Sequence, residues 1–404
     1  MNLILPTGSQ SEARATRERS SSVCGEAPMS SESSSESIQA PAPRSRLVSI
    51  DVVRGIDMFW IIGAQSLVEG LRSISHNGAI RFVADQFEHK PWEGFHLEDL
   101  GLPMFIFIVG VAIVFSVNRS VERTGRGATT KRIFRRSILL YLLGVLYYGG
   151  FSTPFRNIRL LGVLQRIAIC YLAAALLFCW ASRRLLVAIC VMLLVGYWAL
   201  MSFVPVPGVG RANFAEGKNL ANYIDKQYLP LRQEYGDHDP EGLLSTLPAV
   251  ATCLIGVFAG LLLSDDSVND QTKVFYLVST GIVGIALGWL WGLQFPVIKK
   301  IWTSSFVLVA GGYSALLMGI AYQVLDIWQY QRWAQPFIWI GVNPITIYLA
   351  VNLIDFSSIA QLFVGGDVNH FFGAYGQLVL VATTLAIELL LLYFLYRRKI
   401  FLSV

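Results

Sequence analysis

Residues 86–110 read QFEHKPWEGFHLEDLGLPMFIFIVG, and this stretch joins a polar loop directly to an apolar run. Its first half holds two histidines, four carboxylates and a tryptophan. From Leu100 onward the residues are almost all apolar, which predicts a membrane helix with a titratable cluster at its mouth. A histidine there, above all His89, can accept and return a proton near neutral pH, because the unperturbed imidazole pKa is about 6.5. The alternative is a solvated loop that marks the membrane interface.

The composition indicates a polytopic membrane protein. The chain is 54% hydrophobic and 15% charged, with a mean hydropathy of +0.53, whereas a soluble domain carries about 25% charged residues. Apolar runs of spanning length recur from end to end, which predicts an all-α bundle of about ten transmembrane helices. The net charge of +5 is modest and gives no sign of a nucleic-acid partner. The five cysteines form no metal-type cluster, so no metal site or disulfide framework is expected.

Two regions of different character are predicted. Residues 1–45 are rich in Ser, Glu, Arg and Pro and cannot bury a core, so we expect a disordered N-terminal tail. Residues 46–404 form the predicted transmembrane domain. No signal peptide is recognised before it, and its first helix, at about residues 47–71, is expected to act as its own insertion signal.

The distribution of positive charge predicts the topology. Residues 119–136, expected to form a loop between the second and third helices, carry seven Lys or Arg against one acid. By the positive-inside rule this segment is cytoplasmic. Both termini are then expected in the cytoplasm, with His89 on the opposite face. The basic segment also suits an anionic ligand, although a topology signal alone explains most such loops.

Ionisable residues inside predicted spans mark candidate functional positions. Asp51 and Arg54 share a face of the first helix, Arg166 lies in an apolar run, and Glu388 lies in the middle of the last predicted helix. Each has a structural alternative, such as an ion pair that joins helices. Arg166 has two candidate partners, a ligand phosphate or Glu388.

Five motifs resemble the heparan-α-glucosaminide N-acetyltransferase family of multi-pass membrane acyltransferases. In chain order they are D-x-x-R-G at 51–55, H-x-x-W-x-G at 89–94, D-L-x-x-P-x-F-x-F at 99–107, R-x-x-G-V-L-Q-R-I at 159–167 and G-x-N at 341–343. The chain resembles a bacterial-type member of this family, of the inner-membrane type, which lacks the lumenal domain of the animal lysosomal protein. Gln65 stands where the family usually has asparagine, so the amide is kept on a longer arm.

The resemblance implies transfer of an acetyl group from cytosolic acetyl-CoA to an amino sugar or glycan across the membrane, with His89 as the catalytic residue. His89 either acts as a base or takes the acyl group itself. Asp99 is expected to fix the imidazole tautomer or, alternatively, to cap the second helix. The cations expected to hold the CoA phosphates are Arg54, Arg166, Arg135 and Arg136.

Acceptor contacts are expected from Gln65, Trp92, Asp225 and Asn343. Asp225 lies in the longest loop, residues 205–242, which is equally compatible with a structural cap. Asn343 precedes a proline within a predicted helix and can instead satisfy a freed backbone group. His96 is expected to be an ordinary loop histidine.

Two other classes of function compete with acyl transfer. A transporter or flippase for an envelope or glycan precursor also uses intramembrane ionisable residues, and a non-catalytic scaffold in glycan assembly is the third class. Signatures for nucleotide hydrolysis, zinc proteolysis and dinucleotide binding are missing from the sequence. The acceptor, the acyl group, the order of transfer and the oligomeric state stay open, although the resemblance makes a homodimer in membrane lipid reasonable.

Overall fold

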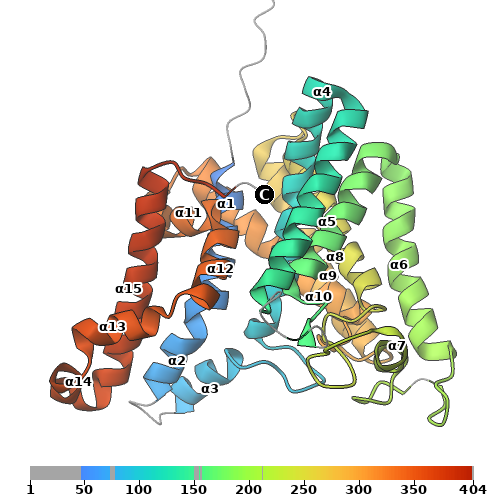
Figure 1. The fold of residues 1–404 in the computed structure, drawn as a ribbon. Coiled ribbons are helices and arrows are strands. Elements are labelled where there is room, and N and C mark those ends of the chain that lie inside the picture. Colours follow the sequence, from blue (N-terminus) through green and yellow to red (C-terminus); the bar gives the residue numbers. More distant parts are fainter. Residues whose placement is uncertain (1–46, 73–77, 150–153, 155–156, 212, 403–404) are drawn as a thin grey trace, which may run out of the picture. The chain divides into compact units, whose positions relative to one another are not determined.

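The computed structural model describes residues 47–402 except 73–77, 150–153, 155–156 and 212. Apart from two isolated β-bridges, every regular element in this part of the chain is helical, which confirms the all-α prediction. The predicted tail, residues 1–45, lies outside the described residues. The elements are α1 Val48–Phe59, η1 Trp60–Ala64, α2 Gln65–Arg72, α3 Gly78–Gln86, η2 Leu97–Leu100, α4 Gly101–Tyr147, α5 Val163–Trp180, α6 Arg183–Phe203, α7 Leu220–Tyr228, α8 Thr246–Leu263, α9 Asp270–Gly292, α10 Ser304–Ala321, η5 Tyr322–Ile327, η6 Arg332–Ala334, α11 Gln335–Val342, α12 Pro344–Leu353, α13 Phe356–Val364, α14 Asp367–Phe372, η7 Gly373–Tyr375 and α15 Gly376–Arg397 (Figure 1).

Within the described residues, seven helices are long and apolar enough to cross a membrane, or eight if the bent pair α11 and α12 is one span. The chain is therefore a multi-pass membrane protein, but the predicted count of ten is not confirmed. The predicted first span, α1 through η1 to α2, is continuous helix and is not among the seven. Its first half carries Asp51, Arg54 and Asp57, which lower its apolar character.

The prediction of a loop at residues 119–136 is wrong, because this segment is helical and belongs to α4. Gly125 alone departs from helical geometry, with φ +78° and ψ 169°. The hydroxyl of Thr129 donates to that of Ser120 over 3.0 Å, whereas a straight helix would separate these residues by about 13 Å. The chain therefore turns back at Gly125, and α4 consists of two limbs.

Small residues let the central helices approach closely. A Cβ on Gly256 of α8 would lie 2.0 Å from the carbonyl oxygen of Phe107 in α4, and one on Gly55 of α1 would lie 1.8 Å from that of Phe337 in α11. Such close backbone approach is typical of packing between membrane helices. The first limb of α4 is consequently the most enclosed helix, and its side chains from Met104 to Ile108 are buried.

The start of α1, the turn of α4 and the end of α15 lie at one end of the helical bundle, at the top of Figure 1. Helices α3, α7, α13 and α14 lie at the other end. His89 follows α3 and therefore lies at the end opposite to the α4 turn. This arrangement agrees with the relative positions expected from the charge pattern, while the side that faces the cytoplasm stays a prediction.

Candidate active site

His89 lies in the loop between α3 and η2, residues 87–96, called here the histidine loop. The loop between α9 and α10, residues 293–303, lies against it and is called the lysine loop. Gly94 donates its backbone N–H to the carbonyl oxygen of Val297 over 2.8 Å, and an antiparallel β-bridge forms at the adjacent residues. Gly94 has φ +115°, a conformation that suits glycine because it lacks a Cβ. Main-chain pairing thus sets the relative position of the two loops.

Three side chains from these loops and from η2 meet at the imidazole. His89 Nδ1 lies 3.3 Å from Asp99 Oδ1 and 3.1 Å from Lys299 Nζ, and Lys299 Nζ lies 3.5 Å from Asp99 Oδ1. The His89 side chain is 61% exposed, whereas that of Asp99 is fully buried. Burial lowers the pKa of Lys299, and the nearby Asp99 carboxylate opposes that shift. Both contacts of the His89 ring are made by Nδ1, so Nε2 is the ring nitrogen turned away from Asp99 and Lys299.

The partners of Asp99 favour one tautomer of the ring. Asp99 Oδ2 accepts from the backbone N–H groups of Lys90 and His96, at 3.3 Å and 3.0 Å. Asp99 Oδ1 is buried and accepts no other hydrogen bond within the described residues. Nδ1 can either accept from Lys299 or donate to Asp99. Because a buried carboxylate oxygen without a donor is costly, we assign the proton to His89 Nδ1, which donates it to Asp99 Oδ1, and Lys299 then pairs with Asp99 and not with Nδ1. This assignment leaves a lone pair on Nε2.

A pocket of about 130 Å³ opens beside the imidazole. It is bounded by the histidine loop, η2, the lysine loop and the long loop after α7. The lining residues are His89, Lys90, Asp99, Tyr235, Pro240, Glu241, Lys299, Lys300 and Trp302. An imidazole, three lysines and two carboxylates therefore line one pocket, which has the size of a small ligand or part of a larger one.

An ion cluster forms one wall of this pocket. Arg159 donates to both carboxylate oxygens of Asp239, over 2.9 Å and 2.6 Å, and to Glu241 over 2.7 Å. Glu234 accepts a further hydrogen bond, and the Arg159 side chain is only 6% exposed. Such two-point pairing fixes geometry as well as charge. The cluster, called here the Arg159 clamp, joins the 159–167 motif to the long loop that covers the pocket.

Arg166 lies behind the pocket and not beside Glu388. Its fully buried guanidinium donates to Ser245 and to the carbonyl oxygen of Gly242, and it lies 4.8 Å from the centre of the Trp302 ring. Trp302 itself lines the pocket and has φ +52°, which is strained for a residue with a side chain. Arg166 therefore supports the pocket floor.

Asp225 is also behind the pocket wall. It is 1% exposed, and its Oδ1 accepts the backbone N–H of Leu243 over 2.9 Å. A Cβ on Gly242 would lie 2.0 Å from Asp225 Oδ2, so the backbone passes very close to this carboxyl group. Burial raises the pKa of Asp225 to about 6. Asp225 holds the loop and does not line the pocket.

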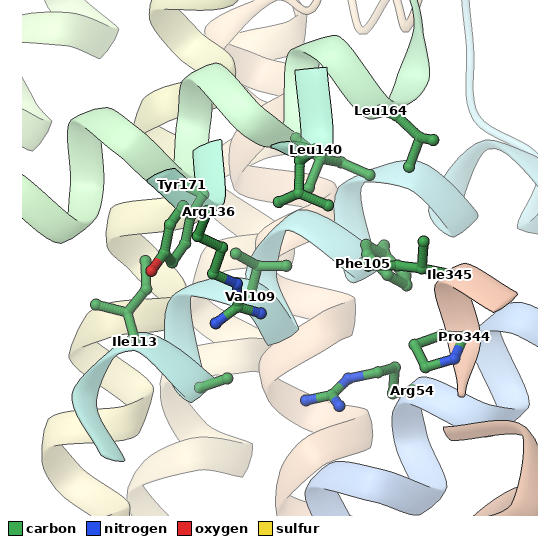
Figure 2. A pocket seen from close by; sticks show the side chains of 12 residues that line it. Arg54, Phe105, Val109, Ile113, Arg136, Leu140, Leu164, Tyr171, Pro344 and Ile345 are labelled. Atoms are coloured by element: carbon green, nitrogen blue, oxygen red, sulfur yellow. The ribbon is translucent and has the colours of Figure 1, made fainter. Parts of the chain in front are cut away.

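A second cavity, of about 80 Å³, holds two of the four predicted CoA-binding arginines. Figure 2 shows the guanidinium groups of Arg54, from α1, and Arg136, from the second limb of α4, pointing toward one another across it. Arg136 lies 4.8 Å from the centre of the Tyr171 ring. Arg135, by contrast, is exposed and does not line this cavity. The remaining walls are mostly apolar and come from α4, α5 and α12.

A smaller apolar cavity extends the second one along α4. Both are lined by Phe105, Leu164, Ile167 and Ile345, and the smaller cavity adds Leu102, Met58 and Tyr348. On α4 the lining positions 102, 105, 109 and 113 recur at helical spacing and cover about 16 Å of helix. Leu102 is about one turn from Asp99. The two cavities therefore follow one face of α4 toward the His89 pocket.

The sequence is similar to that of known proteins. Residues 46–290 match the family model described as heparan-alpha-glucosaminide N-acetyltransferase, catalytic. The chain belongs to the heparan-α-glucosaminide N-acetyltransferase family. The mouse protein named heparan-alpha-glucosaminide N-acetyltransferase is 24% identical over 420 residues, which cover 89% of this chain and 61% of the relative. The human protein of that name is 25% identical over 417 residues, covering 88% and 59%. The chain thus spans about three fifths of the length of these relatives.

The other predicted acceptor residues of this family member are dispersed. Trp92 Nε1 donates to the carbonyl oxygen of Phe214 over 2.9 Å, so its ring anchors the histidine loop to the long loop. Asn343 is 1% exposed and lies at the 69° bend between α11 and α12, where it bonds the backbone of Ile400 and Leu402. Asn343 thus ties the bend to the chain after α15, and its contact with an acceptor stays a prediction. The backbone of Gln65 begins α2, and its side chain lies outside the described residues.

Sequence reasoning missed Lys299 as a site residue. The one available signal was a pair of lysines, Lys299 and Lys300, in a loop expected on the non-cytoplasmic side, against the charge rule. Lys300 pairs with Glu216 at 2.9 Å. His96 has the local role expected of it, since its Nδ1 lies 2.7 Å from the carbonyl oxygen of Glu88. No group of three or more His, Cys, Asp or Glu suited to a metal ion occurs among the described residues.

Proposed function

We propose that this protein is a membrane-embedded acyltransferase that moves an acetyl group from cytosolic acetyl-CoA to an amino sugar or glycan on the opposite side. The observation that carries the proposal is the pairing of His89 with buried Asp99 and Lys299 in an open pocket. Family membership supports the reaction class. The loop between α3 and η2, which carries His89, lies at the end of the helical bundle opposite to the basic turn of α4, and this separation supports transfer across the membrane.

The Arg54–Arg136 cavity is the proposed route for the donor. Its two guanidinium groups suit phosphate oxygens, which accept hydrogen bonds from this planar group. The apolar face of α4 from Ile113 to Leu102 suits the slender, mostly uncharged arm that carries the thioester. In this proposal Arg135 and Arg166 do not contact the donor phosphates. Arg135 is at the surface and Arg166 lies beneath Trp302.

His89 is the proposed base. As the acceptor amine attacks the thioester carbonyl, Nε2 takes the amine proton, a C–N bond forms and the C–S bond breaks. The imidazolium then returns the proton to the departing thiolate, so amide and thiol are the products. Asp99 holds the Nδ1 proton and stabilises the imidazolium, as carboxylates do for catalytic histidines. Lys299 supplies positive charge to the oxyanion that develops on the carbonyl.

The acceptor is proposed to enter from the long loop. Tyr235, Pro240 and Glu241 of that loop line the pocket, and Trp92 ties it to the histidine loop. A pocket of about 130 Å³ with hydrogen-bonding walls suits part of one sugar ring better than an extended chain. Both termini are proposed to be cytoplasmic, and the protein is proposed to work in membrane lipid, with a homodimer as the expected oligomer.

Replacement of the imidazole tests the mechanism. Purified His89→Ala should lose acetyl transfer by about 10²- to 10⁴-fold, the range measured for general acid–base groups. Its affinity for CoA should stay unchanged, because His89 does not line the Arg54–Arg136 cavity. Its unfolding temperature should fall only slightly, because the side chain is 61% exposed and Lys299 still pairs with Asp99 Oδ1. The measurement is transfer of labelled acetyl groups from acetyl-CoA to a panel of amino sugars.

The matched control is His96→Ala, in a histidine of the same loop whose ring does not line the pocket. That variant should keep most of the transfer activity. Near-normal turnover by purified His89→Ala would contradict the assignment.

A further inference from the structure

A groove distinct from the His89 pocket lies along α15. Its α15 lining residues are Gln377, Leu380, Val381, Thr384, Leu385 and Glu388, which recur at helical spacing on one face. The opposite wall comes from η1 and α2, and Ser357 of α13 completes it. The groove has a volume of about 180 Å³ and shares no residue with the His89 pocket.

The groove leads from an exposed mouth to a buried carboxyl group. Gln377, at the start of α15, is exposed, whereas Glu388 is 5% exposed. The distance along the helix between these two positions is about 16 Å, so Glu388 lies near the middle of the span. Its Oε2 is buried and has no hydrogen-bond partner among the described residues. A buried, unpaired carboxyl inside a membrane span is costly and marks a functional position.

Glu388 and Thr384, at the deep end of the groove, offer acceptors to an occupant. The hydroxyl of Thr384 donates its proton to the carbonyl oxygen of Leu380 over 2.9 Å, so only its lone pairs remain for a ligand. An occupant that pairs with both Glu388 and Thr384 is therefore a hydrogen-bond donor, and a positive charge complements the carboxylate. The side chains of Ser66, Ser357 and Gln377 complete the polar part of the lining.

The remaining lining residues favour an organic cation over a metal ion as the occupant. Leu380, Val381, Leu385 and Ile62 give the groove apolar walls beside its polar groups. A hard metal ion needs about six oxygen ligands, far more than the carboxyl and hydroxyl groups near Glu388 supply. A primary ammonium carries three N–H donors and one charge on a carbon chain, which matches both the acceptors and the apolar walls.

The position of the groove next to η1 adds a second argument. Residues Trp60–Ala64 are a π-helical segment, a local distortion that is frequent at functional sites. Within it, Ile61 lines the apolar cavity near α4, and the next residue, Ile62, lines the groove. The groove and the proposed donor route thus lie on different sides of the same short segment.

We propose that the α15 groove is a binding site for a small primary ammonium ion, which enters from the Gln377 mouth and pairs with Glu388 at its deep end. The site takes one charged amine and holds it in the middle of the membrane. It stands independently of the acyl-transfer reaction at His89, because the two pockets share no residue.

The test uses the full-length protein in a non-ionic detergent, with thermal unfolding as the readout. Ethylammonium chloride should raise the unfolding temperature in a saturable way, because a ligand that binds the folded state stabilises it. Sodium chloride at equal ionic strength and tetramethylammonium chloride, which has no N–H donor, should not. Glucosamine is measured in parallel as a larger primary ammonium.

Glu388→Gln should weaken the ethylammonium affinity by about 10- to 100-fold, the value of a hydrogen bond to a charged partner. Thr384→Val should weaken it less. Glu122→Gln, at an exposed position on α4, is the matched control and should keep the full shift.

Three outcomes would overturn the proposal. These are the absence of any ethylammonium shift, an equal shift in Glu388→Gln and wild type, and a shift by sodium ions of the same size that also depends on Glu388. The last outcome would assign the groove to a metal cation.

Discussion

Two charged clusters adjoin at the same end of the helical bundle, and they are built from the same kinds of side chain. In the Arg159 clamp one guanidinium is surrounded by three carboxylates and is almost fully buried. In the His89 pocket one buried carboxylate faces a lysine and an imidazole that is 61% exposed. Glu241 belongs to both.

The difference between them lies in how completely the groups are paired. The clamp leaves its guanidinium with strong, fixed partners on several sides, which suits a static joint. The pocket leaves Nε2 of His89 without a fixed partner in the assigned tautomer, so it can take part in proton transfer. The predictions below test whether stability depends on the first cluster and turnover on the second.

The largest effect is expected from Arg159→Met. This change leaves Asp239 and Glu241 buried without their cation, and loss of one partner of a buried pair costs about 3–5 kcal/mol. The measurement is denaturant or thermal unfolding of purified protein. Lys226→Met is the control, because Lys226 pairs with Asp237 at the exposed surface, where a pair contributes about 0–1 kcal/mol. Equal effects of the two changes would remove the distinction between the clamp and an ordinary surface pair.

A somewhat smaller, pH-dependent effect is expected from Asp225→Asn. Burial raises the pKa of Asp225 to about 6, so between pH 4 and 6 the folded state keeps a proton that the unfolded state has lost. Wild-type stability should therefore fall as pH rises through this window, by about 3 kcal/mol. Asparagine keeps an oxygen for the N–H of Leu243 and does not titrate, so the unfolding free energy of the variant relative to wild type should rise from pH 4 to 7.

The control for that experiment is Asp237→Asn. His238 lowers the pKa of Asp237, so the pH trend of this variant relative to wild type should have the opposite sign. It should also be small, because the Asp237 side chain is 45% exposed. A pH-independent difference between Asp225→Asn and wild type would contradict the expected titration.

The smallest effect is expected at the lysine loop. Lys299→Met removes a positive charge next to the reacting groups and should lower acetyl transfer by about 10- to 100-fold. Lys226→Met is the control here too, because Lys226 is exposed and does not line the pocket. The comparison is made from kcat and KM for the two purified variants. Equal losses in both would contradict a role of the Lys299 charge in the reaction.

Much of the fold follows from the sequence because it depends on local patterns. Apolar runs place most of the helices, and the run after Leu100 places the start of α4 to within a residue. The α4 turn was mispredicted because residues 119–136 are polar enough to resemble a loop, yet they contain one conformational break, at Gly125. A polar helical hairpin beyond a membrane span has no apolar stripe from which a helix could be predicted.

The site is less accessible to sequence reasoning because it is assembled from distant segments. His89 and Asp99 are ten residues apart and fall within one recognisable motif, and the structure brings them within 3.3 Å. Lys299 approaches them only because the histidine and lysine loops pair through their backbones, which no side-chain pattern indicates. The separation of Arg136 from Arg135 is similarly a matter of helix face, fixed by how α4 packs. Their roles in binding stay predictions.

The docking of the lysine loop by main-chain atoms has a consequence for redesign. Because Gly94 and Val297 meet through a peptide N–H and a carbonyl, this contact does not depend on which side chains the two loops carry. The family match ends at residue 290, before the lysine loop begins, whereas His89 and Asp99 lie inside the matched region. Of the lysine-loop residues that line the pocket, Trp302 is buried and Lys299 contacts His89, so Lys300 is the position at which substitution would change a pocket wall around an unaltered imidazole and re-target the proposed reaction toward a new acceptor.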